Sequence, residues 1–214
     1  MHSFQQLIIP RLVELRSQLE GEIWNKRPSS ISVHRTRAFL EHKSFDEAVG
    51  EDFQLIDEFP HFWGDKFEQV WFRVDVSDSI DQKKRFFFWE DGGEATVYLD
   101  GIPYAGIDIP HPYCRIPDGV GELYIEAVCM QTGIWAPNPH NNFTGEKGSE
   151  LRPPRIATRN EDYWQAYLDL DLLMDILKED YKSTGGNAGH FNKWHLGYRE
   201  KIEKAIDDFG MPTI

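Results

Sequence analysis

The chain has 214 residues, of which 40% are hydrophobic and 14% aromatic, so it can bury the core of one large domain, or of a domain with a smaller appendage. Its net charge of -13, from 36 acidic and 23 basic residues, argues against nucleic acid and membrane surfaces as partners, because phosphate backbones and lipid headgroups are themselves anionic.

The N-terminal segment has the pattern of an amphipathic helix. Apolar residues recur at helical spacing from Phe4 to Leu19, Pro10 is tolerated near the first turn, and Gly21 falls near the end. Four charged residues interrupt the segment: Arg11, Glu14, Arg16 and Glu20. They exclude a signal peptide and a membrane span. We therefore expect a helix within residues 1–22 and a cytoplasmic protein.

The period of the sequence then changes to that of strands. Short apolar runs at 31–33, 53–56 and 70–76 are separated by Pro, Gly, Ser and Asp. In the third run Trp71, Arg73 and Asp75 alternate with apolar residues, which predicts one wet face and one buried face.

The segment 86–108 predicts two further strands and a hairpin. Phe86 to Trp89 form an aromatic run that ends in a turn-forming Asp-Gly-Gly, and alternation resumes from Ala95 to Leu99. Asp100-Gly101 follows, a dipeptide that tolerates the positive φ angles of a tight hairpin turn.

The segment Gly121 to Met130 repeats the alternating pattern. Strands in succession without intervening helices favour an antiparallel sandwich over a parallel sheet. We expect the β portion to end near Trp135, because residues 136–154 are rich in Pro, Asn, Gly and Ser and form a linker or a crossing loop. Cys114 and Cys129 fall inside strand-like segments, where we expect reduced packing residues; a cross-strand disulfide is the alternative.

Two helices are expected after the linker. Thr158 and Glu161 have the spacing of a capping box, and an apolar stripe follows from Tyr163 to about Tyr181. A last amphipathic helix is predicted over residues 194–209. The predicted fold class is mainly β: an antiparallel β-sandwich of jelly-roll, galactose-binding-like type over 23–152, preceded by the helix of 1–22 and followed by a helical segment over 153–214.

No known catalytic motif occurs. A phosphate loop, a Gly-x-Ser-x-Gly elbow and a Cys-x-x-Cys pair are all missing, and His190 and His195 are spaced so that they do not share a helical face. Carboxylates cluster beside turns, where solvation and Asx bonds account for them better than a glycosidase pair or a calcium site. We therefore expect no catalytic residue, metal ligand or cofactor in this chain.

Carbohydrate contacts are the one binding chemistry that the sequence suggests. A flat aromatic ring beside carboxylate or amide groups can stack on a sugar and bond its hydroxyls. Two loops, 59–66 and 132–142, have this combination, and their candidate residues are Trp63, Asp65, Trp135, Asn138 and His140. The alternative is that the two Trp residues cap the core or an interdomain seam.

An ordered series of short segments resembles the N-terminal region of the cytosolic type of α-mannosidase, glycoside hydrolase family 38. The segments are 59–64, 71–73, 88–90, 93–95, 98–103, 106–108 and 126–129, then Gly133 with Trp135, a Pro-rich crossing, and the helical run from Asp162 to Lys178. The resemblance covers about residues 55 to 180, and the order of the segments carries it.

The resemblance implies a domain that precedes a catalytic domain in the family. That catalytic domain opens with a metal-binding His-x-Asp segment, binds a divalent metal, expected to be zinc, and cleaves α-mannosidic linkages of oligosaccharides by a retaining mechanism. None of the eight His residues here is followed two positions later by Asp, so no metal ligand or catalytic carboxylate transfers.

We therefore expect a non-catalytic N-terminal domain whose partner is the catalytic domain of the same polypeptide. The chain would then be a fragment of the larger enzyme. The alternatives are an independent carbohydrate-binding module that takes an oligosaccharide, and an assembly domain that forms a homo-oligomer.

Overall fold

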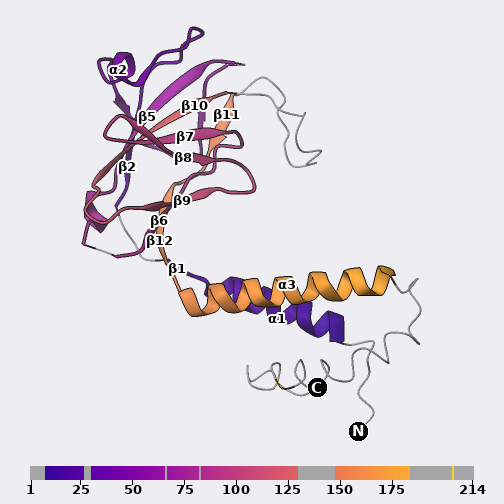
Figure 1. Ribbon diagram of the computed structural model, residues 1–214. Helices are drawn as coiled ribbons and strands as arrows, with labels where there is room; N and C mark the ends of the chain where they lie inside the picture. The colour runs from indigo at the N-terminus through magenta and orange to yellow at the C-terminus, as the bar shows by residue number, and fades with distance from the viewer. Residues whose placement is uncertain are drawn as a thin grey trace. The chain divides into compact units, whose positions relative to one another are not determined.

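The computed structural model describes residues 8–26, 30–65, 67–81, 83–129 and 148–183, together with residue 204. The chain divides into two compact units. One, the β unit, is Lys26–Thr158; the other, the helical unit, combines Met1–Asn25 with Arg159–Ile214. The described residues form mainly antiparallel β-sheets with a few helices (Figure 1).

The strands form three sheets. The six-stranded sheet has the order β3-β2-β5-β10-β7-β8 and is antiparallel throughout. Its strands are β2 (Ser32–Arg35), β3 (Gln54–Leu55), β5 (Gln69–Asp75), β7 (Ala95–Leu99), β8 (Ile102–Ile107) and β10 (Glu122–Val128). The four-stranded sheet, β1-β12-β6-β9, contains β1 (Trp24–Lys26), β6 (Arg85–Phe88), β9 (Tyr113–Ile116) and β12 (Arg155–Arg159). Strands β4 (His61–Trp63) and β11 (Ser149–Leu151) form a two-stranded sheet.

One hydrophobic core receives side chains from all three sheets. On β5 the residues Phe72 and Val74 point into it, opposite Ile125 and Leu123 of β10. Phe87 and Ile156 of the four-stranded sheet and Trp63 and Leu151 of the two-stranded sheet are buried in the same core. The alternating pattern of β5 therefore predicts its buried face correctly.

The opposite face of β5 is less wet than its sequence predicts. Trp71 is fully buried, because the segment before and including the short helix α2 (Phe45–Ala48) covers it. The Trp71 indole Nε1 donates to the carbonyl of Lys43 at 3.1 Å, and the Phe45 ring lies edge-on to it with centroids 5.9 Å apart. The wet-face prediction is wrong at Trp71, since alternation along one strand does not show which remote segment lies over it.

The predicted hairpin is confirmed. Strands β7 and β8 pair antiparallel around Asp100 and Gly101, whose φ angles are 49° and 80°. These left-handed values suit a type I′ turn. A Cβ at position 101 would also lie 2.9 Å from Cε1 of Phe45, so the Phe45 ring would have to shift for any other residue there.

The strands β4, β11 and β12 were not predicted from the sequence. β11 and β12 follow the residues where the β portion was expected to end, so that prediction is wrong, and β4 lies within a predicted loop. Three-residue strands such as β4 and β11 are too short to show a period of two. Strand β12 pairs with β6 over Arg155 to Thr158, and Thr158 is therefore not a helix cap.

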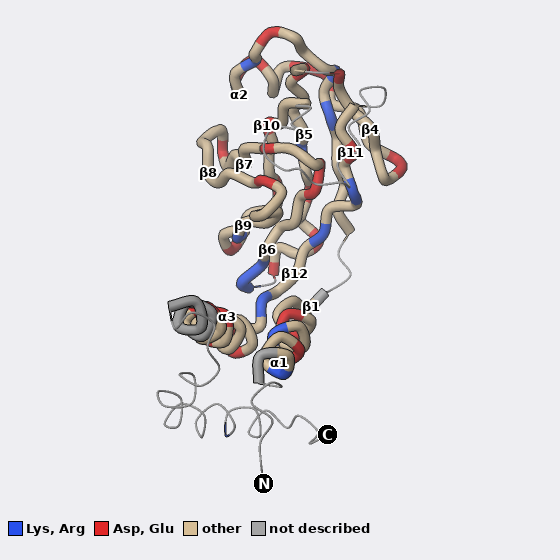
Figure 2. The backbone as a smooth tube through the Cα atoms, turned by 90° about the vertical axis from the view of Figure 1, so that its right-hand side faces the viewer, with Lys and Arg blue, Asp and Glu red and all other residues tan. Residues whose placement is uncertain are grey.

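The helical unit contains α1 (Ile8–Glu22) and α3 (Glu161–Ser183), as predicted in type and approximate extent. They lie side by side and antiparallel, with Leu12, Leu15 and Leu19 of α1 packed on Leu170 and Met174 of α3 (Figures 1 and 2). Arg16 binds Asp171 at 2.7 Å and also donates to the Tyr167 hydroxyl.

Asn160 caps α3 in place of the predicted Thr158. Its side-chain oxygen accepts from the backbone N–H of Asp162 at 3.2 Å and of Tyr163 at 3.4 Å, the role of an N-cap residue. The predicted last helix, 194–209, lies outside the described residues apart from Lys204, which is helical. Among the helices described, none has the length and apolar character needed to cross a membrane.

Asp91, in the turn after β6, gives a testable pH dependence. It is 3% exposed and accepts hydrogen bonds from Trp89 Nε1 and the Gly93 N–H, each at 3.0 Å. Burial raises the pKa of the Asp91 carboxyl, and the hydrogen bonds from Trp89 and Gly93 oppose that rise. The folded state therefore holds this proton more tightly than the unfolded state, whose pKa is about 3.9.

The stabilising contribution of Asp91 is thus largest at low pH and is lost as pH rises through its raised folded pKa. We expect the difference in unfolding free energy between wild type and Asp91→Asn to become less favourable to wild type from about pH 4 upward. Urea unfolding at a series of pH values measures it. A difference that stays constant with pH contradicts the prediction.

Candidate functional site

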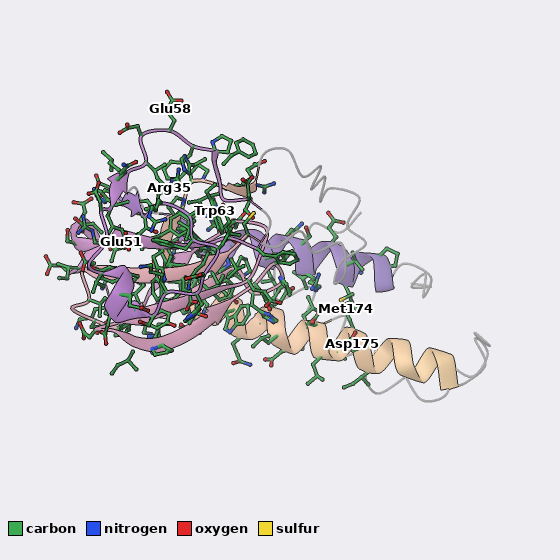
Figure 3. The ribbon with its side chains drawn as sticks, turned by 90° about the horizontal axis from the view of Figure 1, so that it is seen from above. Arg35, Glu51, Glu58, Trp63, Met174 and Asp175 are labelled. Carbon is green, nitrogen blue, oxygen red and sulfur yellow. The ribbon has the colours of Figure 1, made fainter. Side chains whose placement is uncertain are left out.

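The predicted sugar-contact residues Trp63 and Asp65 lie at the connection between β4 and β5. Trp63 is 2% exposed, and its ring packs edge-on against Phe72 with centroids 5.3 Å apart. Figure 3 labels it among the side chains of the β unit. Both faces of the indole are therefore occupied by protein, which is the core role that the sequence left open as an alternative. Asp65 is exposed.

The described residues of the connection, 64–65 and 67–68, are held by several hydrogen bonds. The Phe67 N–H donates to the carbonyl of Cys129 at 2.6 Å, and the Cys129 N–H donates to the carbonyl of Glu68 at 2.8 Å. Gly64 has a φ of 66°, and a Cβ there would lie 2.9 Å from Cβ of Cys129. The Glu68 carboxylate accepts from the Asp65 N–H at 2.7 Å. These hydrogen bonds fix the backbone of the turn to the end of β10.

The turn also contains Phe67, an exposed aromatic residue that is not among the candidates predicted from the sequence. Phe67 is 61% exposed and has a φ of 67°, a left-handed conformation that is uncommon for a bulky side chain. Phe62 on β4 is 43% exposed, and its partner across the two-stranded sheet is the exposed Glu150. We call Phe62, Asp65 and Phe67 the aromatic turn. Strained non-glycine backbone occurs preferentially at functional sites.

A carbohydrate contact is one chemistry that the side chains of the aromatic turn allow. Two partly exposed phenyl rings and one exposed carboxylate lie on a short, anchored segment of chain, and such groups can stack on the C–H face of a sugar and accept from its hydroxyls. The combination of aromatic and acidic residues in the loop 59–66 predicted which segment to examine. It did not include Phe67, whose conformation depends on a contact with Cys129, which is remote in sequence.

His61, which precedes these residues on β4, is half-buried. Burial lowers the pKa of its imidazole, and the charge of Arg35 lowers it further. The ring is therefore held neutral near pH 7, and its Nε2 is buried without a hydrogen-bond partner. Arg35 and Trp63 are both labelled in Figure 3.

The other three candidate residues, Trp135, Asn138 and His140, lie outside the described residues. Their role in sugar binding stays a prediction.

A second polar cluster lies on the outer face of the six-stranded sheet. One Glu126 oxygen accepts from Gln69 Nε2 at 2.6 Å and lies 3.3 Å from His42 Nε2, and the other accepts from the Tyr98 hydroxyl at 2.7 Å. Burial raises the pKa of Tyr98 to about 12, and the hydrogen bond and charge of Glu126 add to that rise. Because protein donors already engage both carboxylate oxygens, we interpret this cluster as an anchor for the segment that covers Trp71.

The cysteines are free and buried, as expected for packing residues. Burial raises the pKa of the Cys114 thiol to about 12, which disfavours the reactive thiolate. Within the described ranges, no three or more His, Cys, Asp or Glu side chains are grouped so that they could hold a metal ion.

Comparison with known proteins gives no assignment: no protein-family model and no curated protein matches this chain.

Proposed function

We propose that this chain is the non-catalytic N-terminal region of an α-mannosidase-like enzyme of glycoside hydrolase family 38. One observation supports the proposal most directly: the segments between residues 59 and 129 that carry the resemblance lie in one β unit. They supply the Trp71–Arg73 stretch of β5, the β7–β8 hairpin and the end of β10 in the six-stranded sheet, and the end of β6 in the four-stranded sheet.

The same proposal specifies the fold more finely, as a β-sandwich of jelly-roll, galactose-binding-like type. Its support is that the six-stranded and four-stranded antiparallel sheets contribute to one core. The catalytic domain of the parent polypeptide, its divalent metal and its retaining cleavage of α-mannosidic linkages belong to the proposal as well. We assign no metal ligand and no catalytic carboxylate to this chain, because no His-x-Asp segment occurs in it.

The proposal predicts that the isolated chain does not hydrolyse an aryl α-mannoside, with or without added zinc. The measurement is release of the aryl group, with a known α-mannosidase as positive control. Clear turnover by the chain would overturn the proposal. A second test joins the chain to the catalytic domain of a family member in place of that enzyme's own N-terminal region, and we expect the hybrid to fold and turn over substrate. Aggregation of the hybrid without activity would count against the proposal.

The exposed rings of the aromatic turn favour a second candidate function, direct binding of a mannose oligosaccharide. We expect Phe67→Gly to weaken such binding about tenfold, since a stacking ring is lost. Glycine is the sharpest replacement because it adopts the left-handed backbone of position 67 without strain, so the turn itself is kept.

Titration calorimetry with mannose oligosaccharides measures the effect. Tyr104→Ala is the matched control, since Tyr104 is a 43% exposed aromatic residue on the edge strand β8, away from the turn. Equal loss of affinity in both variants, or no heat from the wild-type chain, would rule out the aromatic turn as the sugar contact.

A further inference from the structure

Helix α3 has a second apolar face besides the one that packs on α1. Leu168, Leu172 and Ile176 are 40%, 64% and 47% exposed, and their spacing of four residues places them along one side of the helix. The α1 contacts come from Leu170 and Met174 on the other side. We call Leu168, Leu172 and Ile176 the outer stripe. Three large apolar side chains in a row on an exposed helix face indicate a contact surface.

Carboxylates border the outer stripe on both sides. At about 100° per residue, Asp162 and Asp169 fall along one edge and Asp171 and Asp175 along the other. From Glu161 to Leu177 the helix sequence contains no Lys, Arg or His, and Lys178 and Lys182 follow before its end. Asp171 is paired with Arg16 of α1 and Glu161 with Arg159 before the helix. Asp169 accepts from Gln165 Nε2 at 2.9 Å, and Asp175 also has an interaction partner. Figure 2 shows the acidic residues along α3, and Figure 3 labels Asp175 beside Met174.

We propose that the outer stripe docks a basic amphipathic helix, one with an apolar face bordered by Lys or Arg. Apolar side chains of the partner cover Leu168, Leu172 and Ile176, while its cations face the two acidic borders. A second copy of this chain would bring the same acidic borders together, which repels. An anionic membrane surface is repelled in the same way. The proposal depends only on α3 and is independent of the parent enzyme.

The test measures binding of two designed helical peptides to the full 214-residue chain by fluorescence anisotropy. The peptides have identical apolar faces of Leu, bordered by Lys in one and by Glu in the other. We expect the Lys peptide to bind, the Glu peptide to bind at least about tenfold more weakly, and added salt to weaken the Lys peptide.

Variants of the chain locate the contact. Leu172→Gln should weaken the Lys peptide about tenfold or more, because it removes the most exposed leucine of the stripe and keeps a good helix former. Asp169→Lys combined with Asp175→Lys should reverse the preference between the two peptides. Val13→Gln is the matched control: Val13 on α1 is 50% exposed but lies outside the stripe, so affinity should not change. Far-UV circular dichroism checks that each variant keeps its helices.

Several results would overturn the proposal. They are no binding of the Lys peptide, equal binding of the Glu peptide, and equal effects of Leu172→Gln and Val13→Gln. If the chain associates with itself or sediments with anionic lipid vesicles, and this is lost in Leu172→Gln, the outer stripe binds a different partner. That result would also overturn the proposal.

Discussion

Replacing Arg85 with Met is expected to lower the free energy of unfolding by about 3–5 kcal/mol, the largest effect of any substitution considered for this protein. Arg85 on β6 is fully buried, and its guanidinium donates to the carbonyls of Pro117 and Val120 at 3.1 and 2.7 Å and to Ser79 Oγ at 2.9 Å. Burial disfavours the charged form and lowers the pKa of this guanidinium. We therefore attribute the stabilising contribution of Arg85 to its hydrogen bonds.

Methionine keeps part of the volume of Arg85 and removes every donor. The half-buried carbonyls of Pro117 and Val120 and the buried Ser79 hydroxyl then lose the Arg85 donor, which costs about 1–3 kcal/mol for each group left unsatisfied. Urea unfolding followed by circular dichroism measures the loss. Arg115→Met is the matched control, because Arg115 is exposed on the adjacent strand β9, and we expect it to change stability by no more than about 0.5 kcal/mol. A loss below about 1 kcal/mol in Arg85→Met would show that the buried hydrogen bonds are dispensable.

Gly148→Ala is expected to have the second large effect, about 3 kcal/mol or more of lost stability. A Cβ at Gly148 would lie 2.2 Å from the Gly64 carbonyl oxygen and 2.4 Å from that of Trp63, and both are backbone atoms that cannot rotate away. The φ of 74° adds strain for any residue with a Cβ. The chain at 148 must therefore move away, and strand β11 loses its pairing with β4.

Gly119→Ala separates the two causes. Gly119 has a similar φ of 82°, but a Cβ there meets nothing within 4 Å, so only backbone strain remains and we expect a cost of about 1 kcal/mol. Amide hydrogen exchange gives the second readout: protection at β4 and β11 should fall in Gly148→Ala and stay unchanged in Gly119→Ala. Equal loss of stability in the two variants would contradict the steric explanation.

Part of the candidate site could be predicted from the sequence and part could not. The sequence shows that aromatic and acidic residues occur together around Trp63 and Asp65. Only the structure shows that the exposed rings are those of Phe62 and Phe67 and that Trp63 is buried. The turn at Phe67 is bonded by the Cys129 backbone, more than sixty positions further along the chain. The spacing of apolar residues along α3 is visible in the sequence, but the contact with α1 decides which apolar face of this helix is buried.

The sequence by itself determined the features that depend on neighbouring residues. The Asp100-Gly101 turn follows from local φ preferences, the strands β5, β7 and β10 from their period of two, and α1 and α3 from helical spacing. Only the tertiary structure decided that Trp63 and Trp71 are buried, that Arg85 lies inside, and that β11 and β12 complete the sheets. The physical reason is that burial and strand pairing are properties of remote segments in contact, and a pattern along one segment does not contain its partner.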